Sequence, residues 1–387
     1  MPRKTTRNAQ GGGTIRQRKD GTWEGRFTVG RDPGTGKQIQ KSVYGKTQKE
    51  VRQRLQQITT AIDDGTYVAP SKLTVGEWLG TWLEDFCVDV KPRTLEKYRS
   101  TVRVRLLPYL GKIKLSDLSA HHIQHVYNSF RTGDNALSPK SIRDLHGILH
   151  RALQQAVELE YIRTNPADRC KLPRAEKPEI KPMESQHIAA FLQAIQGNRF
   201  ERLFMVDLFT GLRMGEILAL SWDCIDFERG TMRIYRQLQQ VKGEYIFGTL
   251  KNDKPRSLAV APSVLEALKT QRAQQRRWRI VAGAAWENVE DLVFTNEIGQ
   301  HLSPNTVRNA LHRITEPLGL EGFRFHDLRH SYAVASLQAG DDLKTLQSNL
   351  GHHTAAFTMS VYGHCTEEMQ QKSAARMEDF IHGVSNL

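Results

Sequence analysis

The sequence contains few cysteines and no long apolar run. Its four cysteines among 387 residues, Cys87, Cys170, Cys224 and Cys365, are far apart and lack CxxC spacing. They predict neither a disulfide framework nor a zinc site, and they suit a reducing cytosol. The first 13 residues lack the apolar core of a signal peptide, and no segment approaches the roughly 20 apolar residues that span a bilayer. We therefore expect a soluble cytoplasmic protein without a membrane partner.

Acidic residues are also in deficit. The chain has 55 Lys and Arg against 42 Asp and Glu, a net charge of +13. Such an excess costs self-repulsion unless a polyanion offsets it, so nucleic acid is the leading candidate partner and we expect association with the nucleoid. The excess is uneven, because residues 1–70 hold 14 basic and 6 acidic side chains, a difference of 8. A merely solvated basic surface would be spread more evenly.

A chain of this length predicts several domains rather than one core. Residues 1–13 are polar and glycine-rich, which indicates a flexible lead. Within residues 14–70, apolar alternation predicts three strands up to residue 44, and Thr47 and Glu50 have the spacing of a capping box ahead of a helix. This pattern predicts a three-stranded sheet with one face packed on the helix.

The other face of that sheet would present basic side chains to a DNA groove; the alternative is an ordinary α+β module with a solvated basic face. Its candidate DNA-binding residues are Arg16, Arg18 and Arg26. The helical region that follows adds further candidates, although charged helix faces are usually only solvated. These are Lys91, Arg93, Lys97, Lys140 and Arg143.

Residues 73–170 have the pattern of an all-helical domain. A helix is expected from near Thr94 towards Leu107, ended by Pro108 and Gly111. Ser138 is expected to begin another helix, with proline at its first position. The next segment, 171–183, contains three prolines and predicts an extended linker.

Residues 184–387 alternate helices with a short strand-rich insert near 224–260. The predicted fold is therefore multidomain and mainly α with small β-sheets. It comprises an N-terminal three-stranded sheet plus helix (14–70), a helical domain (73–170) and a mixed α/β domain with a C-terminal tail (184–387).

Five short segments of the last domain carry basic or nucleophilic side chains. They are TGLRMGE around Arg213, the turn-rich GTLKND around Lys251, HDLRH from His326 to His330, LGH ending at His352, and VYGH around Tyr362. Each alone has an ordinary structural interpretation, such as an ion pair of Arg213 with Glu216 or a core tyrosine at 362. His326 and His330 could share a helix face as zinc ligands, but the glutamate of HExxH is absent.

Together these segments form the ordered pattern Arg…Lys…His-x-x-Arg…His…Tyr. In this pattern the sequence resembles the tyrosine recombinase family, in particular the integrases of phages and conjugative elements, over residues 184–365. The resemblance implies an active site made of Arg213, Lys251, His326, Arg329, His352 and Tyr362. It also implies cleavage of each DNA strand to a 3′-phosphotyrosine with a free 5′ hydroxyl, followed by strand exchange and religation, without metal or nucleotide cofactor.

The chemistry calls for the same residue types. Attack on a phosphodiester passes through a five-coordinate phosphorus with extra negative charge, which the planar forks of Arg213 and Arg329 are suited to hold. A tyrosine phenol, with a pKa near 10, gives an ester that can be reversed without ATP. Lys251 is a candidate general acid for the departing 5′ oxygen, with Lys254 as an alternative. His326 would accept the phenolic proton or bond a phosphate oxygen, and His352 would hold the phosphate.

The resemblance further implies partners and an assembly. Core-type and arm-type attachment sites in double-stranded DNA, a homotetramer, an excisionase and a host DNA-bending protein are those expected. The C-terminal tail, 367–383, would dock on a neighbouring protomer or pack within its own. Glu216 would brace the Arg213 loop. The extra N-terminal module favours an element integrase over a Xer-type resolvase.

Two other classes of protein compete with this interpretation. A type IB topoisomerase uses a similar residue set, and a DNA-binding regulator would need no nucleophile.

Overall fold

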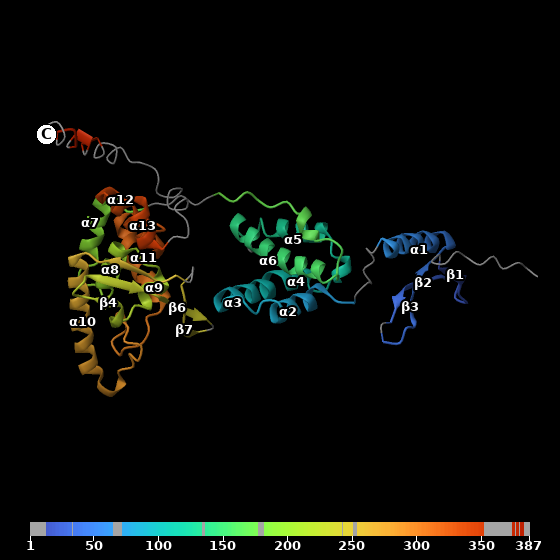
Figure 1. The fold of residues 1–387 in the computed structure, drawn as a ribbon, viewed down its shortest axis with the longest axis horizontal. Helices are drawn as coiled ribbons and strands as arrows, with labels where there is room; N and C mark the ends of the chain where they lie inside the picture. Colours follow the sequence, from blue (N-terminus) through green and yellow to red (C-terminus); the bar gives the residue numbers. More distant parts are fainter. Residues whose placement is uncertain are drawn as a thin grey trace, which may run out of the picture. The chain divides into compact units, whose positions relative to one another are not determined.

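The computed structural model describes residues 13–32, 34–64, 72–133, 136–176, 182–241, 243–250 and 254–351, together with 374, 375, 377, 378 and 380–382. The chain divides into two compact units, residues 1–176 and 177–387 (Figure 1). Helices predominate and the three small sheets are antiparallel, which confirms the predicted fold class.

A three-stranded sheet with one helix against it begins the first unit. Its elements are β1 (Thr14–Gln17), β2 (Trp23–Arg31), β3 (Gln38–Gly45) and α1 (Gln48–Asp63), with the strands in the order β1-β2-β3. Phe27, Val51 and Leu55 are buried between sheet and helix. A Cβ atom on Gly25 would lie 2.5 Å from a Leu55 methyl carbon, so glycine lets the helix approach the sheet closely. The predicted sheet and helix are confirmed.

The cap of α1 differs in part from the prediction. The Thr47 hydroxyl accepts a hydrogen bond from the backbone N–H of Glu50 at 3.2 Å, as a capping residue should. The Glu50 carboxylate, however, accepts from the backbone N–H of Lys46 at 3.1 Å rather than from that of Thr47. Only half of the expected capping box is therefore formed.

Helices make up the rest of the first unit. They are α2 (Val75–Asp85), α3 (Pro92–Thr101), a π-helical turn (Val102–Leu106), α4 (Leu107–Leu110), α5 (Ala120–Ser129) and α6 (Pro139–Glu158), with short 3₁₀ turns at Leu115–Asp117 and Pro166–Arg169. Their core includes Trp78, whose indole N–H donates to the Ala152 carbonyl at 2.8 Å and thereby ties α2 to α6. The predicted start of α6 at Ser138 is confirmed.

The helix expected from near Thr94 is confirmed, and so is its end at Gly111, but Pro108 does not have the role predicted for it. The helix begins two residues before Thr94, because Pro92 lies in the first turn, where a missing N–H costs nothing. Pro108 does not end it but lies inside α4. The π-helical turn just before it changes the hydrogen-bonding register, with the Leu107 N–H bonding to the Val102 carbonyl, and so lets the helical path continue through the proline.

The segment predicted as a linker is bonded to the body of the protein at both described ends. The Lys171 N–H donates to the Gln124 side chain at 2.7 Å, and Arg143 donates to the Pro173 carbonyl at 3.2 Å. At the other end the Met183 N–H donates to the Ser331 hydroxyl at 2.8 Å. Residues 171–176 and 182–184 have no regular secondary structure, and 177–181 lie outside the described residues.

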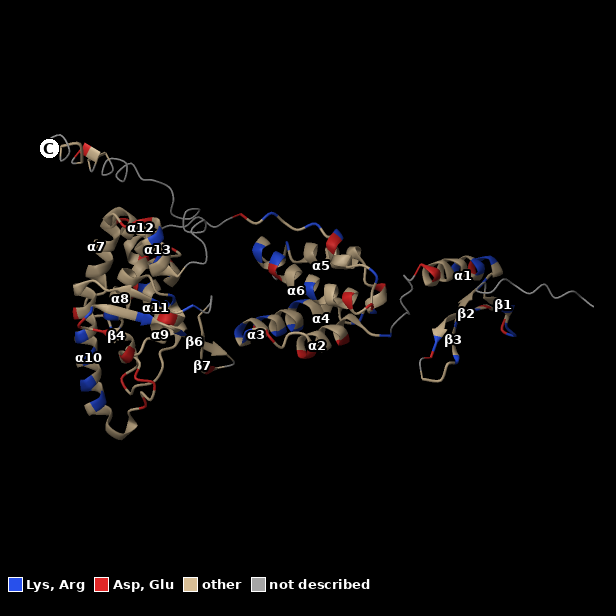
Figure 2. Cartoon of the chain, viewed as in Figure 1, with Lys and Arg blue, Asp and Glu red and all other residues tan. Residues whose placement is uncertain are grey.

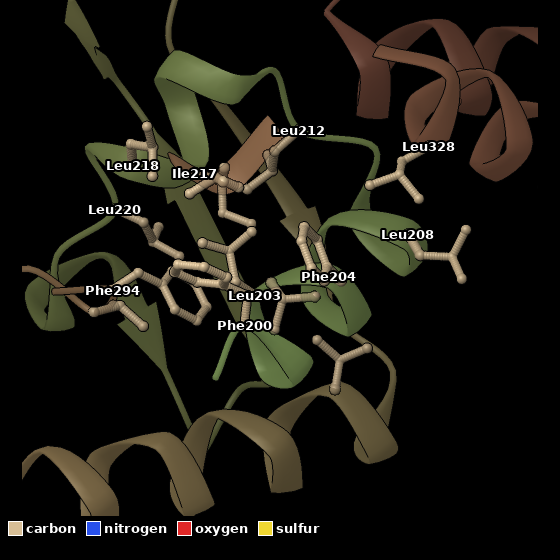
Figure 3. Packing of buried hydrophobic residues seen from close by; sticks show 14 of the residues in the cluster. Phe200, Leu203, Phe204, Leu208, Leu212, Ile217, Leu218, Leu220, Phe294 and Leu328 are labelled. Atoms are coloured by element: carbon tan, nitrogen blue, oxygen red, sulfur yellow. The ribbon is translucent and has the colours of Figure 1, made fainter. Parts of the chain in front are cut away.

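The second unit packs helices around a long hydrophobic core. Its helices are α7 (Ser185–Ala194), α8 (Glu201–Thr210), α9 (Met214–Leu218), α10 (Pro262–Ala282), α11 (Pro304–Thr315), α12 (Phe325–Ala339) and α13 (Leu343–Leu350), with 3₁₀ turns at Trp222–Cys224, Gly283–Ala285 and Glu316–Leu318. Helix α8 packs on both α10 and α12. Phe204, Leu208 and Leu212 hold the end of α8 in this core (Figure 3).

The predicted strand-rich insert near 224–260 is confirmed. It consists of β4 (Ile225–Asp226), β5 (Thr231–Ile234), β6 (Arg236–Val241), β7 (Glu244–Thr249) and β8 (Arg256–Ala259). Strands β4, β5 and β8 form one sheet, and β6 and β7 form a hairpin.

Candidate active site

Arg213 lies at the surface of the core, just after the end of α8. Gly211 follows α8 with a φ of +61°, and a Cβ atom there would lie 2.4 Å from the Tyr332 ring, so both the backbone and the space require glycine. Leu212 is buried, and Arg213 then caps α9. The TGLR motif is thus a tight turn that fixes one end of the arginine.

The Glu216 carboxylate binds both the side chain and the backbone of Arg213. It accepts from the Arg213 guanidinium at 2.6 Å and from the Arg213 backbone N–H at 3.0 Å. It also accepts from Arg256, at 3.2 and 2.7 Å. Burial raises the pKa of Glu216, but the hydrogen bonds and charge of Arg256 and the charge of Arg213 outweigh it and lower the pKa to about 2. The carboxylate is therefore ionised at neutral pH, as a brace for Arg213 must be.

Arg329 on α12 is fixed beside the same turn. Its guanidinium donates to the Gly211 carbonyl at 2.8 Å and to the Leu350 carbonyl. Arg213 in turn donates to the carbonyl of the adjacent residue, Gly351, at 3.2 Å. The structure therefore brings Arg213 and Arg329 together at two consecutive carbonyl groups that directly precede His352.

The two histidines of the HDLRH motif lie on one face of α12. The rings of His326 and His330 make an edge contact, with centroids 4.8 Å apart. Burial, and then the charges of His330, Arg329 and Arg213, lower the pKa of His326 to about 4, so His326 is neutral at pH 7. Within the described part of the chain, no group of three or more His, Cys, Asp or Glu side chains is arranged to hold a metal ion.

Three predicted site residues, Lys251, His352 and Tyr362, lie outside the described residues, as does Cys365. The residues just before two of them are described. Leu250, which precedes Lys251, is 3% exposed, and Gly351, which precedes His352, ends α13 with a φ of +61°. The alternative general acid, Lys254, is exposed.

The sequence analysis missed two buried residues of this region. Arg256 binds Glu216 and also donates to the Asn349 carbonyl at 2.7 Å. Asp207 on α8 is fully buried, and neither of its carboxyl oxygens has a hydrogen-bond partner among the described residues. Burial raises the pKa of Asp207 well above its usual range, although the charge of Arg329 opposes this. A signal for Asp207 was present, because it interrupts the apolar run LFMVDLF.

A cavity of about 540 Å³ lies beside His326 and beside Met214, the residue that follows Arg213. It is lined by His326 and by basic side chains of α11 and its neighbourhood, including Arg308, His312 and Arg324. Arg324 is paired with Asp327 at 2.8 Å. Arginine and histidine side chains therefore share the lining of this cavity with Met214, Phe323 and Phe325.

The eight candidate DNA-binding residues of the first unit are all exposed. Lys and Arg residues, coloured blue, occur in both units (Figure 2). Several of the eight have partners: Arg16 and Arg26 pair with Glu24, Arg18 stacks on the Tyr44 ring, Lys97 pairs with Asp144 at 2.8 Å, and Arg143 donates to the Pro173 carbonyl. Lys91 caps α3, while Arg93 and Lys140 lie in the first turns of α3 and α6.

Cys87, Cys170 and Cys224 are free thiols. No helix in the described ranges is both long and apolar enough to cross a membrane.

Comparison with known proteins identifies the family of the chain. The model of the phage integrase family matches residues 180–369, and that of the phage integrase N-terminal SAM-like domain matches residues 74–131. A tyrosine recombinase XerC-like protein of Caldanaerobacter subterraneus subsp. tengcongensis is 30% identical over 374 residues, which cover 92% of this chain and 95% of that protein. The chain belongs to the phage integrase family and is a tyrosine-type site-specific DNA recombinase.

Solved structures share the fold. A Tn1549 transposon integrase in complex with transposon right end DNA has a TM-score of 0.67 at 20% identity, covering 79% of this chain and 100% of that one. A lambda integrase tetramer bound to a Holliday junction has a TM-score of 0.58 at 18% identity, covering 93% of this chain and 99% of that one.

Proposed function

We propose that Arg213, Arg329, His326, Lys251, His352 and Tyr362 form one active site for DNA strand cleavage and religation. The observation that carries this proposal is the pairing of Arg213 and Arg329 on the consecutive carbonyls of Leu350 and Gly351. Two anchored guanidinium groups supply the fixed positive charge that a five-coordinate phosphorus requires. No reorganisation is then needed as the charge develops.

Arg213 is the guanidinium that an incoming phosphate would meet first. Its side chain is 21% exposed, whereas Arg329 is 1% exposed and lies deeper. Of the five N–H donors of a guanidinium, Arg213 uses one for Glu216 and one for Gly351, so three point to no partner in the described structure. These donors suit two oxygens of one phosphate.

The proposed reaction includes two proton transfers, one from the attacking phenol and one to the departing 5′ oxygen. The Tyr362 phenol attacks phosphorus, and its proton passes to His326, which is neutral and so able to accept it. The bond from phosphorus to the 5′ oxygen breaks, and Lys251 protonates that oxygen. A 3′-phosphotyrosine and a 5′ hydroxyl result, and the reverse reaction with a new 5′ hydroxyl rejoins the strand. His352 would bond the phosphate from the residue after Gly351.

We further propose the three-part organisation of residues 14–70, 73–170 and 184–387, joined by 171–183. The first would bind arm-type DNA, the second core-type DNA, and four protomers would act together on paired attachment sites of a mobile element. An excisionase and a host DNA-bending protein would set the direction. The N-terminal module alone does not separate an integrase from a Xer-like resolvase, because the XerC-like relative aligns with 92% of this chain.

The nucleophile is tested with suicide core-site DNA, built from the sequences that flank the gene, in EDTA. The wild-type protein should form a covalent adduct on a denaturing gel, and Tyr362→Phe should form none while binding the site normally. Equal loss of adduct and binding would assign Tyr362 a structural role. Relaxation of plasmids without attachment sites would indicate a topoisomerase, and absence of any adduct would indicate a regulator.

The N-terminal module is tested by deletion of residues 1–66. We expect weaker binding of arm-site DNA and unchanged cleavage of suicide core sites, because the buried clusters of this module and of the last domain share no residue. Both are measured on the same preparation, by gel shift and by adduct formation. A deletion protein that binds core DNA but no longer cleaves it would contradict the proposed division.

A further inference from the structure

Arg256 is a buried side chain beside the proposed site that makes several hydrogen bonds and that the reaction itself does not use. It begins β8, and its side chain is only 8% exposed. Its guanidinium makes three hydrogen bonds, two to the Glu216 carboxylate at 3.2 and 2.7 Å and one to the Asn349 carbonyl at 2.7 Å. A planar fork that uses both end nitrogens and Nε on fixed acceptors has little freedom to move.

Two of these bonds connect Arg256 with Arg213. Glu216 lies between them and accepts from both guanidinium groups. Because the carboxylate is itself 1% exposed, its position depends on these two partners rather than on water. Without Arg256, the Glu216 carboxylate would be bound only by Arg213 and could move with it. The orientation of the Arg213 guanidinium would then no longer be fixed.

The third bond connects Arg256 with the turn before His352. Asn349, whose carbonyl accepts from Arg256, directly precedes the two residues whose carbonyls accept from Arg329 and Arg213. A Cβ atom on Gly351 would lie 3.1 Å from Cδ of Arg256, so the turn also packs against the aliphatic part of the side chain. The Arg256 guanidinium therefore binds Glu216, which holds Arg213, and also binds the turn whose carbonyls accept from Arg213 and Arg329.

The position of Arg256 in the chain adds a third connection. Residues 250–255 separate β7 from β8 and include Lys251. Arg256 is the first residue of β8 and pairs with Ile234 of β5. An anchor at Arg256 therefore fixes the point at which the chain after Lys251 enters the sheet of β4, β5 and β8.

We propose that Arg256 is a positioning residue that holds the Arg213 guanidinium, the turn before His352 and the end of the lysine-bearing segment in one arrangement, without contacting DNA. This inference rests on the proposed role of Arg213. It accounts for an arginine that is buried away from the cavity beside the site and yet bonded to the supports of both proposed phosphate-binding groups.

The charge of Arg256 also matters. Burial raises the pKa of Glu216, and Arg256 contributes the main opposing interactions. In an Arg256→Gln protein we therefore expect Glu216 to titrate at higher pH. As the pH falls through that raised pKa, Glu216 becomes neutral and loses its ion pair with Arg213; as the pH rises, the carboxylate forms again. Cleavage by the variant should therefore rise with pH over a range in which the wild-type carboxylate stays ionised.

The experiment compares full-length Arg256→Gln, Arg256→Lys and Arg213→Gln proteins on suicide core-site DNA. Arg199→Gln serves as the matched control, since it removes an arginine paired with a carboxylate, Glu297, at the surface of the same unit. Cleavage rate, core-site Kd and thermal unfolding are measured from about pH 5.5 to about pH 8.5.

We expect Arg256→Gln to cleave roughly 10²-fold more slowly near pH 7 with its Kd within about twofold of wild type, because misplacement of a catalytic group by about 1 Å costs that much. Its rate should recover partly as the pH rises. Arg256→Lys, which keeps the charge but not the fork, should be intermediate, and Arg199→Gln should match wild type.

The inference would be overturned if Arg256→Gln cleaved within about twofold of wild type while Arg213→Gln was inactive. It would also fail if Arg256→Gln and Arg256→Lys lost DNA binding and the unfolding transition together, since that indicates a general role in folding. Normal cleavage by Arg213→Gln would instead overturn the proposed role of Arg213, and with it this inference.

Discussion

The N-terminal module and the second unit each contain a carboxylate held between two arginines. In the module, Glu24 on β2 accepts from Arg16 at 2.7 Å and from Arg26 at 3.1 Å. Hydrogen bonds from Arg16, Ser42 and Arg26 lower the pKa of Glu24 to about 2. In the second unit, Glu216 has the same two-arginine environment and a pKa of about 2, although burial acts against it.

The two networks differ in the exposure of their arginines. The side chains of Arg16 and Arg26 are 59% and 45% exposed, whereas those of Arg213 and Arg256 are 21% and 8% exposed. Both carboxylates are buried, at 5% and 1% exposed. A half-exposed arginine is screened by water and changes partner at little cost, while a buried pair is strongly destabilised when one partner is lost. The same set of contacts therefore makes an exchangeable basic surface in one unit and a fixed support in the other.

The largest expected difference follows from removing each carboxylate charge. Glu216→Gln should lower the free energy of unfolding by about 3–5 kcal/mol, because it leaves two poorly solvated guanidinium groups without their anion. It should also slow cleavage of suicide DNA roughly 10²-fold. Glu24→Gln, the matched variant on the module, should leave cleavage unchanged. Chemical denaturation and adduct formation measure the two effects, and equal behaviour of the variants would remove the distinction between the networks.

Acid unfolding sharpens the comparison. The folded-state pKa of Glu216, about 2, lies below its ordinary value of 4.5, so its contribution to stability is complete above about pH 5 and is lost as the pH falls through about 2. The shift corresponds to about 3 kcal/mol. We expect the difference in unfolding free energy between wild type and Glu216→Gln to shrink steadily from pH 5 to pH 2. A difference independent of pH would show that the effect of the substitution is steric.

Local sequence signals predicted most of the fold. The alternation around Phe27, the start of α6 after Ser138 and the strand-rich character of residues 224–260 all depend on neighbouring residues, and all are confirmed. Pro108 was misjudged because the π-helical turn that lets the helix pass it depends on packing in the helical core, which no local pattern records.

The proposed site was predictable where its residues belong to short motifs and not where they act over distance. Arg213 and Arg329 lie in TGLR and HDLRH, and the structure brings them to adjacent carbonyl groups. Arg256 meets its partners Glu216 and Asn349 across 40 and 93 residues of sequence, so no spacing rule identifies it. Tertiary hydrogen bonds of this kind become visible only once the segments are assembled.

The smallest expected effect concerns the exposed network. In the proposed complex, Arg16 and Arg26 leave Glu24 and contact phosphates. Arg16→Gln and Arg26→Gln should then each lower, by about 1, the slope of the logarithm of the arm-site binding constant against the logarithm of salt concentration. Core-site cleavage should not change. Lys49→Gln is the matched control, because Lys49 is an exposed cation on α1, the helix that covers the opposite face of the sheet. Binding isotherms at several salt concentrations measure the slopes. Unchanged slopes for both arginine variants would mean that the two guanidinium groups stay on Glu24 in the complex, and that the module meets DNA with another surface.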